Sequence, residues 1–452
     1  MSTRPRSTGW DNLLRRAEAA REVGRTALPS AAPARGTSAA TDFTTLPGMA
    51  DQFLQRNVAA KLDIASPYFR VHEGIAGAHT QIGGRDYVNF CSYDYLGLNG
   101  DPRITAAAKD AIDAYGISAS ASRCIAGERP VHRRLEERLA AHYGVEDCVV
   151  FVSGWMTNTG VIGELVGAKD LVLLDEAIHN SALMGGSLSH ATRKSFRHND
   201  LAHLAAILEE FRGQFERALI VVEGLYSMDG DYPDLAGLVA LKERHEAWLM
   251  VDEAHALGVL GARGHGLAEE CGVDPRAVDI WMGTLSKALA ACGGYIAGSA
   301  ALVDYVKSQV GAFIYSVAMP PVIAAAAEKA LELLHCEPER AVRLRRNGAT
   351  FHAHAKSLGL DTGTSRGVAI APVIIGDSLP TALLSARLYE RGFNTMPVVY
   401  PGVPARQARI RFFLTAEHTE NEIAAVLDAT AEELPPIHDR IRRLRLAATN
   451  PA

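Results

Sequence analysis

The chain is 452 residues long, 48% of them hydrophobic and 22% charged, and its formal net charge is −6. This length predicts two or three domains, and the mildly negative charge gives no reason to expect nucleic acid or an anionic membrane as a partner. The six cysteines contain no C-x-x-C pair, which argues against a zinc site and a disulfide framework.

The N-terminal region, residues 1–50, is predicted to be an extension and linker. Its first residues lack the apolar core of a signal peptide, and no apolar run in the chain reaches the ~20 residues that span a bilayer. We therefore expect a soluble cytoplasmic protein. Residues 11–24 predict a short charged helix, and residues 28–41, rich in Pro, Ala, Ser and Thr, predict a linker. A docking element for a partner protein is the alternative interpretation.

From about residue 85 the chain alternates short apolar runs with helix-length segments. Runs that are rich in β-branched residues and end in polar residues or glycine are typical of buried strands in a largely parallel α/β sheet. They occupy residues 148–154, 171–175, 218–224, 248–253, 279–284 and 294–298. Ligands of such sheets bind beyond the carboxyl ends of the strands. The polar residues and glycines at these ends are Ser153, Gly154, Asp175, Glu223, Asp252 and Thr284.

The pattern changes after about residue 335. Residues 367–375 and 408–415 resemble strands, with helical segments between and after them, which predicts a smaller C-terminal α+β domain. The expected division is an extension over 1–50, an N-terminal segment of the small domain over 51–100, a large ligand-binding domain over 101–335, and the small domain over 336–452.

Asp252 opens an Asp-Glu-Ala-His sequence at the end of a strongly apolar strand. A carboxylate there could keep a pyridinium nitrogen protonated, so that the ring acts as an electron sink. A Mg²⁺ site and a helix N-cap are equally compatible with these four residues. A helicase is excluded because the chain contains no G-x-x-x-x-G-K-[ST] motif.

Lys287 follows another apolar strand, in the sequence Gly-Thr-Leu-Ser-Lys. Most lysines are solvated surface charges. Just beyond a buried strand, however, desolvation lowers the pKa of an amine and makes Schiff-base chemistry feasible. Thr284 and Ser286 offer hydroxyls for a phosphate, and the glycines that follow Lys287 would let backbone approach a bulky ligand.

Two further strand ends carry candidate residues. The turn at Ser153 and Gly154 opens a helix, whose N-terminal amides form a natural phosphate cradle. His179 follows the strand over residues 171–175 and could stack on an aromatic ring. A packing or capping histidine is an equally good interpretation of His179 alone.

Together these features resemble the α-oxoamine synthase family of fold-type I pyridoxal-phosphate enzymes, which includes 8-amino-7-oxononanoate synthase, 5-aminolevulinate synthase and serine palmitoyltransferase. The resemblance spans about residues 85–430. The segments that carry it are residues 89–98, 132–136, 175–181, 223–231, 252–255, 283–287 and 315–321. It implies an α/β fold with a large domain, built on a mostly parallel seven-stranded sheet, and a smaller C-terminal α+β domain.

The resemblance also implies a role for each matching residue. Lys287 would hold pyridoxal 5′-phosphate as a Schiff base and move protons at the substrate α-carbon. Asp252 would pair with the ring nitrogen, His255 with the ring hydroxyl, and His179 would stack on the ring face. The remaining cofactor contacts would be the amides of Gly154 and Trp155, the hydroxyl of Thr284, Ser227 beside the ring, and Ser316 reaching the phosphate of the neighbouring subunit.

Arg411 matches the arginine that binds the amino-acid carboxylate in this family, a task that suits a bidentate guanidinium. Arg409 lies two positions away and is easily confused with it. The implied reaction is a decarboxylative condensation, in which a small amino acid (glycine, alanine or serine) attacks an acyl thioester and yields an α-amino ketone. The family is homodimeric, and each active site is built from both subunits.

Two departures from the family pattern stand out. Residues 116–123 read Gly-Ile-Ser-Ala-Ser-Ala-Ser-Arg where glycines are common, a form that resembles synthases of polyketide-type pathways. There the acyl group can arrive on a carrier protein instead of coenzyme A. The segment that contains Ser316 also lacks a second hydroxyl residue often found in the family.

Two alternative functions remain open at the level of sequence. An aminotransferase or aldolase would share the fold and the pair of Asp252 and Lys287. A non-catalytic subunit that binds a carrier protein would need a degraded site, and the intact Asp252, His255 and Lys287 argue against it.

Overall fold

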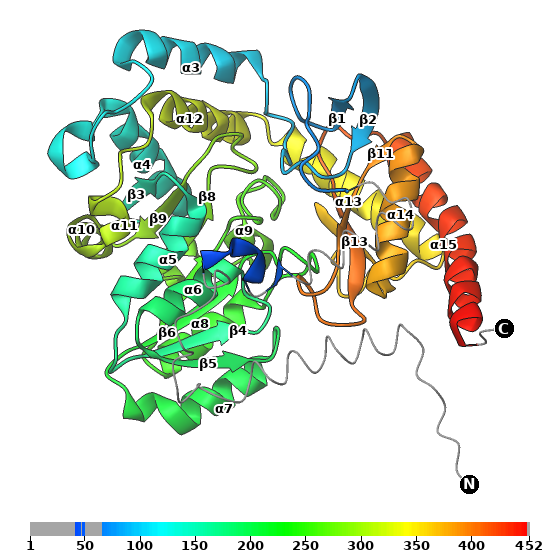
Figure 1. Cartoon of the computed structure of the whole chain (residues 1–452). Coiled ribbons are helices and arrows are strands. Elements are labelled where there is room, and N and C mark those ends of the chain that lie inside the picture. Colours follow the sequence, from blue (N-terminus) through cyan, green and yellow to red (C-terminus); the bar gives the residue numbers. More distant parts are fainter. Residues whose placement is uncertain (1–40, 47, 50–65, 450–452) are drawn as a thin grey trace.

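The structure is a computed structural model of the chain, and it describes residues 41–46, 48–49 and 66–449. A large part contains a broad sheet between layers of helices, and a smaller part contains the C-terminal strands and helices (Figure 1). The predicted helix over residues 11–24 lies outside the described residues, as does all but the last residue of the predicted linker.

The large part is built on a seven-stranded sheet with the order β3-β9-β8-β7-β6-β4-β5. Only β9 runs antiparallel to its neighbours. The strands are β3 (Asp147–Phe151), β4 (Leu171–Asp175), β5 (Thr192–Phe196), β6 (Ala218–Glu223), β7 (Trp248–Asp252), β8 (Ile280–Thr284) and β9 (Gly294–Gly298). The carboxyl ends of the parallel strands therefore meet at one edge, where the sequence predicts the ligand site.

Helices cover both faces of this sheet because alternate residues of its strands are buried on opposite sides. Val149 and Val172 belong to one core, whereas Cys148 and Leu171 belong to the other. The first core is covered by α5 (Gly154–Leu165), α6 (Asn180–Leu188), α10 (Ala300–Gln309) and α11 (Gly311–Ile314). The second is covered by α4 (Pro130–Tyr143), α7 (Leu201–Phe211), α8 (Leu235–Arg244) and α12 (Pro321–Cys336), with α3 (Pro102–Tyr115) packed on α12.

Five short helical segments are described besides these helices. They are η2 (Phe43–Thr45), η3 (Arg123–Gly127), η4 (Arg212–Gln214), α9 (Leu267–Cys271) and η5 (Pro275–Ala277).

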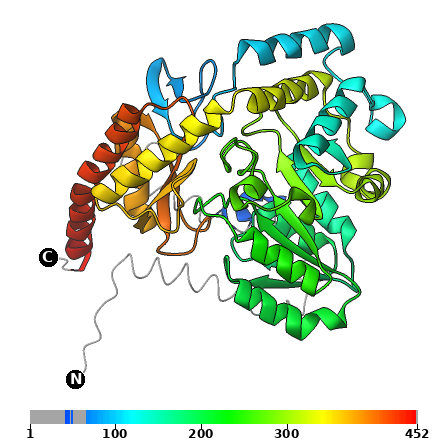
Figure 2. The ribbon, with the colours of Figure 1, turned by 180° about the vertical axis from the view of Figure 1, so that it is seen from behind.

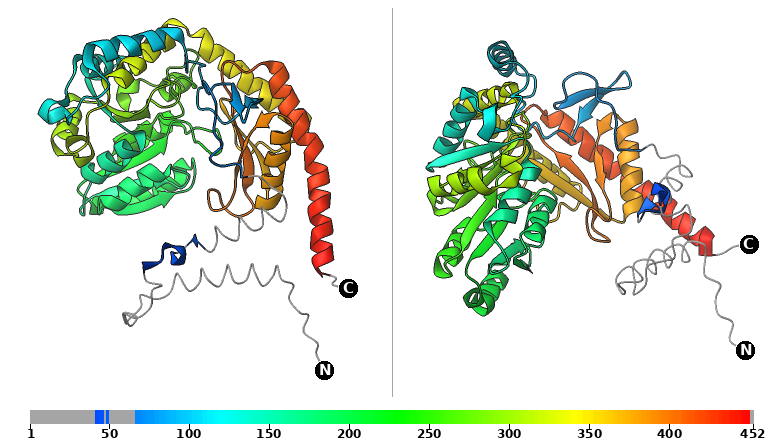
Figure 3. Two further views of the ribbon diagram at one scale, coloured as in Figure 1. Left: turned by 45° about the horizontal axis from the view of Figure 1, so that its top comes forward. Right: turned by 60° about the vertical axis from the view of Figure 1, so that its left-hand side comes forward.

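The smaller part contains two three-stranded sheets and three long helices. One sheet is antiparallel and has the order β10-β13-β12, with β10 (Ile370–Gly376), β12 (Met396–Val398) and β13 (Ala408–Phe413). The other joins β1 (His79–Ile82) and β2 (Arg85–Asn89) to β11 (Phe393–Asn394). The helices are α13 (Glu339–Ser357), α14 (Ser378–Glu390) and α15 (Glu420–Thr449). Figure 2 shows α13 leading from the large part into the smaller one, and Figure 3 shows α15 along the outside.

The predicted fold class is confirmed, and the structure adds elements that the sequence pattern does not reveal. The edge strand β5 reads Thr-Arg-Lys-Ser-Phe and is largely exposed, so it lacks the apolar run by which the other strands are recognised. The short strands β11 and β12 are likewise too brief to show a period. The domain boundaries at residues 50, 100 and 335 stay predictions. No helix among the described residues is long and apolar enough to cross a membrane.

Candidate active site

The carboxyl ends of β6 and β7 place two acidic residues side by side. Glu223 and Asp252 are the last residues of these strands and are register partners in the sheet. Both are buried, with 2% and 4% of their surface exposed. Burial, together with the charge of Asp252, raises the pKa of Glu223 to about 8. At neutral pH this raised pKa favours the protonated form of Glu223.

Two donors fix the carboxylate of Asp252. Its Oδ2 accepts a hydrogen bond of 2.7 Å from Nδ2 of Asn158, a buried residue of α5. Its Oδ1 accepts a hydrogen bond of 2.9 Å from the backbone N–H of Ala254. The predicted partner of a cofactor nitrogen is thus held in one orientation at the end of its strand.

His179 is the N-cap of α6. Its Nδ1 accepts a hydrogen bond of 3.3 Å from the backbone N–H of Ser181 and lies 2.7 Å from Oγ of the same serine. Burial lowers the pKa of His179, and the charges of Lys287 and Arg411 lower it further, against the opposing charge of Asp252. The lowered pKa favours the neutral ring. The capping interpretation is confirmed, and stacking of His179 on an aromatic ring stays a prediction.

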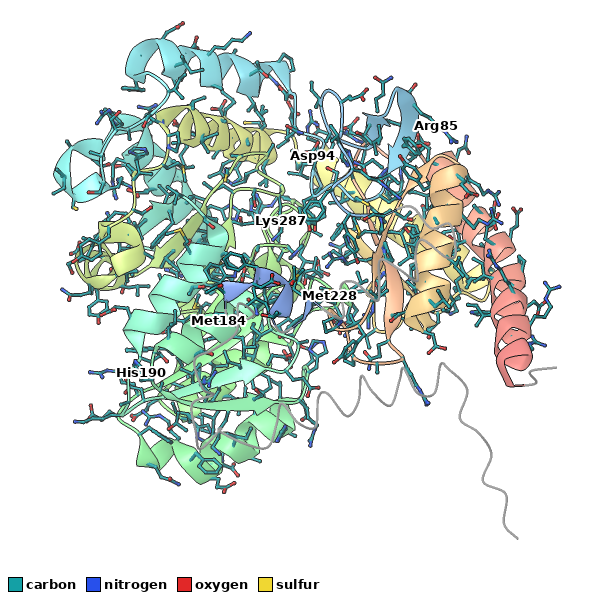
Figure 4. The ribbon with its side chains drawn as sticks, in the orientation of Figure 1. Arg85, Asp94, Met184, His190, Met228 and Lys287 are labelled. Carbon is teal, nitrogen blue, oxygen red and sulfur yellow. The ribbon has the colours of Figure 1, made fainter. Side chains whose placement is uncertain are left out.

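Lys287 lies in the loop between β8 and β9, at the centre of the molecule, between the large sheet and the C-terminal strands (Figure 4). Its Nζ is 5.9 Å from the centre of the Tyr93 ring. Burial lowers the pKa of Lys287 to about 8, although the acidic groups of Asp252 and Glu223 act in the opposite direction. At neutral pH the amine therefore has a far larger nucleophilic fraction than a surface lysine.

His255 is held by a buried tyrosine. Its Nδ1 lies 2.7 Å from the hydroxyl oxygen of Tyr95, whose side chain has no exposed surface. Burial lowers the pKa of His255 well below its usual value, and the charge of Lys287 lowers it further. His255 is thus a neutral, fixed imidazole on the same side of the molecule as Lys287.

A second group of candidate residues surrounds the start of α5. Gly154 is the first residue of this helix, and a side chain there would come within 2.9 Å of Oγ1 of Thr284. The end of β8 and the start of α5 are therefore in close contact. The hydroxyl of Thr284 donates to the carbonyl of Gly293 at 2.8 Å and lies 2.9 Å from that of Ser286.

The first amides of α5 are available to a ligand. The side chain of Ser153 caps Met156, and its carbonyl accepts from Thr157. Within the described residues, the N–H groups of Gly154 and Trp155 have no such acceptor. A helix N-terminus with free amides, beside two hydroxyls, is suited to bind a phosphate.

The structure distinguishes the two arginines of β13. Arg411 donates from Nη1 to the carbonyl of Ser227 at 2.9 Å, while its buried Nε has no partner in the part of the chain that is described. Arg409 is 3% exposed, pairs with Asp229 and donates to the carbonyl of Gln407 at 3.0 Å. Arg411 therefore keeps a donor for a substrate, whereas the guanidinium of Arg409 is occupied by partners within the protein.

The two remaining candidates, Ser227 and Ser316, differ in position. Ser227 joins the site, because its N–H donates to Oε2 of Glu223 at 3.2 Å and its carbonyl accepts from Arg411. Ser316 lies after α11, and none of its hydrogen bonds in the described region links it to another candidate. Its role toward a neighbouring subunit stays a prediction.

Four residues at the site were not assigned a role from the sequence: Tyr95, Asn158, Ser181 and Glu223. Glu223 was indicated only as a strand end. Asn158 follows the turn at Ser153 and Gly154, and Ser181 follows His179, but the hydrogen bonds of both residues join segments that are far apart in the chain. No local pattern could reveal them.

The arrangement combines a buried amine of low pKa, a fixed carboxylate, a phosphate cradle and an arginine with a free donor. Such a set can bond a carbonyl group, hold an anion and a carboxylate, and stabilise a protonated ring nitrogen. It can move protons near neutral pH through the amine.

Comparisons with known proteins agree with this chemistry. The family model described as aminotransferase class I and II matches residues 85–429. The 8-amino-7-oxononanoate synthase of Symbiobacterium thermophilum is 42% identical over 351 residues, which are 78% of this chain and 89% of the relative. That of Methylocella silvestris is 43% identical over 356 residues, which are 78% of this chain and 99% of the relative.

Among solved structures, a serine palmitoyltransferase from S. paucimobilis with bound PLP (pyridoxal 5′-phosphate) superimposes with a TM-score of 0.83. It is 28% identical and covers 88% of this chain and 99% of its own. The serine palmitoyltransferase of Sphingomonas wittichii gives the same TM-score, identity and coverage.

Proposed function

The chain belongs to the aminotransferase class I and II family and, within it, to the α-oxoamine synthases, and on this premise we propose how its own residues carry out the reaction. The reaction is the decarboxylative condensation of an amino acid with an acyl thioester to an α-amino ketone. The cofactor is pyridoxal 5′-phosphate. The relatives reported above are 8-amino-7-oxononanoate synthases and serine palmitoyltransferases, which favours the condensation over an aminotransferase, an aldolase or a non-catalytic subunit.

The residues at the site fit this cofactor. A side chain on Gly294 would come within 2.4 Å of Oγ1 of Thr157 and 2.7 Å of the Cα of Gly154, so the glycine lets β9 pack directly against the start of α5, where the free amides of Gly154 and Trp155 lie. Gly154, Trp155 and Thr284 would hold the phosphate. Asp252, oriented by its two donors, would hold the ring nitrogen. The remaining ring contacts would come from His179 on one face, His255 at the ring hydroxyl and Ser227 beside the ring.

Lys287 is the central catalytic residue of this proposal. When bound, the cofactor supplies an electron sink for negative charge at the substrate α-carbon. Lys287 would be bonded to the cofactor at rest and, once displaced by the amino acid, would remove and return the α-proton. A pKa of about 8 suits an amine that must both accept and release a proton near neutral pH.

Arg411 would bind the carboxylate of the amino acid. Its guanidinium is anchored on the carbonyl of Ser227 and keeps Nε free, so it is both fixed and able to donate. The amino acid of this proposal is a small one, glycine, alanine or serine, and the ring of Tyr93, 5.9 Å from Nζ of Lys287, is a neighbour of the reacting amine. Coenzyme A and an acyl-carrier protein both remain candidates for the acyl donor.

A homodimer is part of the proposal. Large apolar side chains are exposed on adjoining elements of one region, where α6, α5, α11 and η3 contact one another in turn. They are Ile125, Trp155, Leu183, Leu188, Tyr315 and Val317. Exposed apolar surface of this kind supports burial against a second copy, which would bring Ser316 to the phosphate of its neighbour.

The location and the domain division complete the proposal. All six cysteines are free, which supports a reducing compartment, and we assign the enzyme to the cytoplasm. We divide the chain into an extension over 1–50, a small-domain segment over 51–100, a large domain over 101–335 and a small domain over 336–452. The change from the seven-stranded sheet to the smaller sheets between β9 and β10 supports the boundary near residue 335.

The observation that carries these assignments is the half-buried Lys287, whose desolvated amine has a lowered pKa, among Asp252, Glu223 and Arg411. The test supplies the holoenzyme with glycine, alanine or serine and an acyl thioester, either acyl-coenzyme A or acyl-carrier protein, and measures release of CO₂ and free thiol. We expect Lys287→Ala to lose both turnover and the visible absorbance of the bound cofactor. Lys169→Ala, which removes an exposed lysine paired with Glu216, is the matched control and should retain both. Full activity in Lys287→Ala would refute the proposal.

A further inference from the structure

A chain of hydrogen bonds joins Asp252, which would contact the nitrogen of the cofactor ring, to His179, which would stack on the face of that ring. It runs from Oδ2 of Asp252 to Nδ2 of Asn158 (2.7 Å), on to Oγ of Ser181 (2.9 Å) and then to Nδ1 of His179 (2.7 Å). We propose that Asn158 and Ser181 are positioning residues, which hold His179 as the neutral tautomer with its proton on Nε2. The functional meaning of this tautomer rests on the proposed function of the site.

The direction of the chain follows from its end at Asp252. A carboxylate only accepts hydrogen bonds, so the amide of Asn158 must present its nitrogen to Asp252. The second hydrogen on the same nitrogen then points at Oγ of Ser181, which accepts it. All three side chains are buried, with at most 4% of their surface exposed, so water does not compete for these bonds.

The other end of the chain fixes the proton on the imidazole. Because Oγ of Ser181 accepts from Asn158, its own hydrogen is free to be donated to Nδ1 of His179. The backbone N–H of Ser181 also donates to this nitrogen, as the N-cap bond of α6. A nitrogen that receives two donors carries a lone pair and no proton. The ring proton must therefore be on Nε2.

The charges around His179 agree with a neutral ring. The groups that act on it are Asp252 at the end of β7, Lys287 after β8 and Arg411 on β13. Only Asp252 favours the imidazolium form, and its charge is already partly satisfied by Asn158 and Ala254. Nε2 makes no hydrogen bond among the described residues, so its N–H is free for a substrate oxygen.

The consequence concerns what His179 can do in the reaction. A neutral ring with Nε2–H is a hydrogen-bond donor and has a flat face for stacking, whereas an imidazolium would repel the nearby cations of Lys287 and Arg411. We therefore expect His179 to orient the substrate by donating one hydrogen bond. We do not expect it to act as a general acid in its charged form.

The first test needs no substitution at Asn158 or Ser181. The full-length holoenzyme is labelled with ¹⁵N-histidine, and the resonances of His179 are assigned by their loss in His179→Gln. At pH 7 we expect Nδ1 at the position of an unprotonated nitrogen and Nε2 at that of a protonated one, with a titration midpoint below the ordinary value for histidine. A protonated Nδ1, or a charged ring at pH 7, would overturn the inference.

The second test removes one donor. In Ser181→Ala the ring should exchange between its two tautomers, which would move the Nδ1 resonance toward the average of the protonated and unprotonated positions. The apparent pKa of the acid limb of the kcat profile should rise by about half a pH unit or more, because the neutral ring loses the free energy of one hydrogen bond. Ser181→Thr keeps the hydroxyl and should restore both signatures. The control is Ser189→Ala, which removes a buried hydroxyl at the other end of α6 that donates to the carbonyl of Gly186.

The outcomes separate this inference from the proposed function. If Ser181→Ala folds, with an unchanged thermal midpoint relative to Ser189→Ala, and leaves both the resonances and the pH profile as in the wild type, the positioning role is refuted. The resonances report the tautomer whether or not the enzyme turns over a given substrate. Failure to find the condensation reaction would therefore refute the proposed roles and leave the tautomer measurement standing.

Discussion

At the scale of single residues, position along a strand does not decide the role of a side chain. Arg409 and Arg411 lie on the same face of β13, because side chains two apart in a strand point the same way. The difference between them comes from a neighbouring loop. It offers the carboxylate of Asp229 to Arg409, whereas it offers Arg411 the backbone carbonyl of Ser227 and the sulfur of Met228 but no charged partner.

This difference predicts different effects of one conservative change. Arg411→Lys keeps the charge but loses the planar fork, so we expect the KM for the amino acid to rise about 10- to 100-fold, with a smaller change in kcat. Arg409→Lys keeps a charge for Asp229 and should leave KM within about twofold of the wild type. Steady-state kinetics with the preferred amino acid would check this. Equal KM values for the two variants would contradict the assignment of Arg411.

At the scale of elements, one histidine links the segments that follow β5, β4 and β6. His198, just after β5, lies 2.9 Å from Oδ1 of Asp175 at the end of β4 and 3.1 Å from Oδ2 of Asp231. The two carboxylates raise the pKa of His198 to about 10, against the effect of burial. The loop over residues 224–231 contains both Asp231 and Ser227. The imidazolium of His198 therefore anchors the loop that carries Ser227.

A substitution at His198 should therefore depend on pH. A pKa raised above the value of about 6.5 in the unfolded chain gives stability that is complete below that pH and is lost as the pH rises toward 10. We expect His198→Gln to lower the free energy of unfolding by about 3 kcal/mol near pH 6, because two buried carboxylates lose their partner. The loss should shrink toward pH 10.

Thermal or urea unfolding across this pH range would measure the effect. His190→Asn is the control, since His190 is exposed and has a positive φ of 59° that asparagine tolerates. A loss of stability in His198→Gln that is the same at pH 6 and pH 10 would contradict a charged histidine at this position.

At the scale of the whole molecule, the site lies where the large sheet meets the smaller part. The loop over residues 224–231 touches β10 so closely that a side chain on Gly230 would come within 2.1 Å of the carbonyl oxygen of Ile370. The N–H of Arg366 donates to the carbonyl of Gly230 at 3.0 Å. Lys287 and Asp252 come from one part and Arg411 from the other, so their relative placement depends on this contact.

The proposed dimer gives a prediction at the same scale. Tyr315 is 88% exposed beside Ser316, and Tyr315→Asp would place a charge on the apolar region described above. We expect this variant to sediment as a monomer and to bind pyridoxal 5′-phosphate more weakly than the wild type. Val342→Asp changes an exposed apolar residue on α13 and should remain dimeric. A fully dimeric Tyr315→Asp would argue against this surface as the interface.

Much of the site could be predicted because its chemistry sits at strand ends. The strands β4, β6 and β8 are buried at every position and apolar up to polar last residues, Asp175, Glu223 and Thr284, so their carboxyl ends can be recognised from the sequence. Asp252, Lys287 and Thr284 follow from this rule. The resemblance to a known family supplied roles that the rule cannot give.

By itself, then, the sequence determined the class of fold, because buried strands leave local patterns. It also predicted the edge of the sheet that carries the chemistry, and the resemblance to a family singled out Lys287 among the lysines. Only the tertiary structure decided which of the two arginines keeps a donor without a partner among the described residues, that burial beside Asp252 raises the pKa of Glu223, and that Asn158 and Ser181 connect Asp252 to His179. These properties depend on hydrogen bonds and desolvation between segments distant in the chain. No local pattern records them, and the fold alone brings them about.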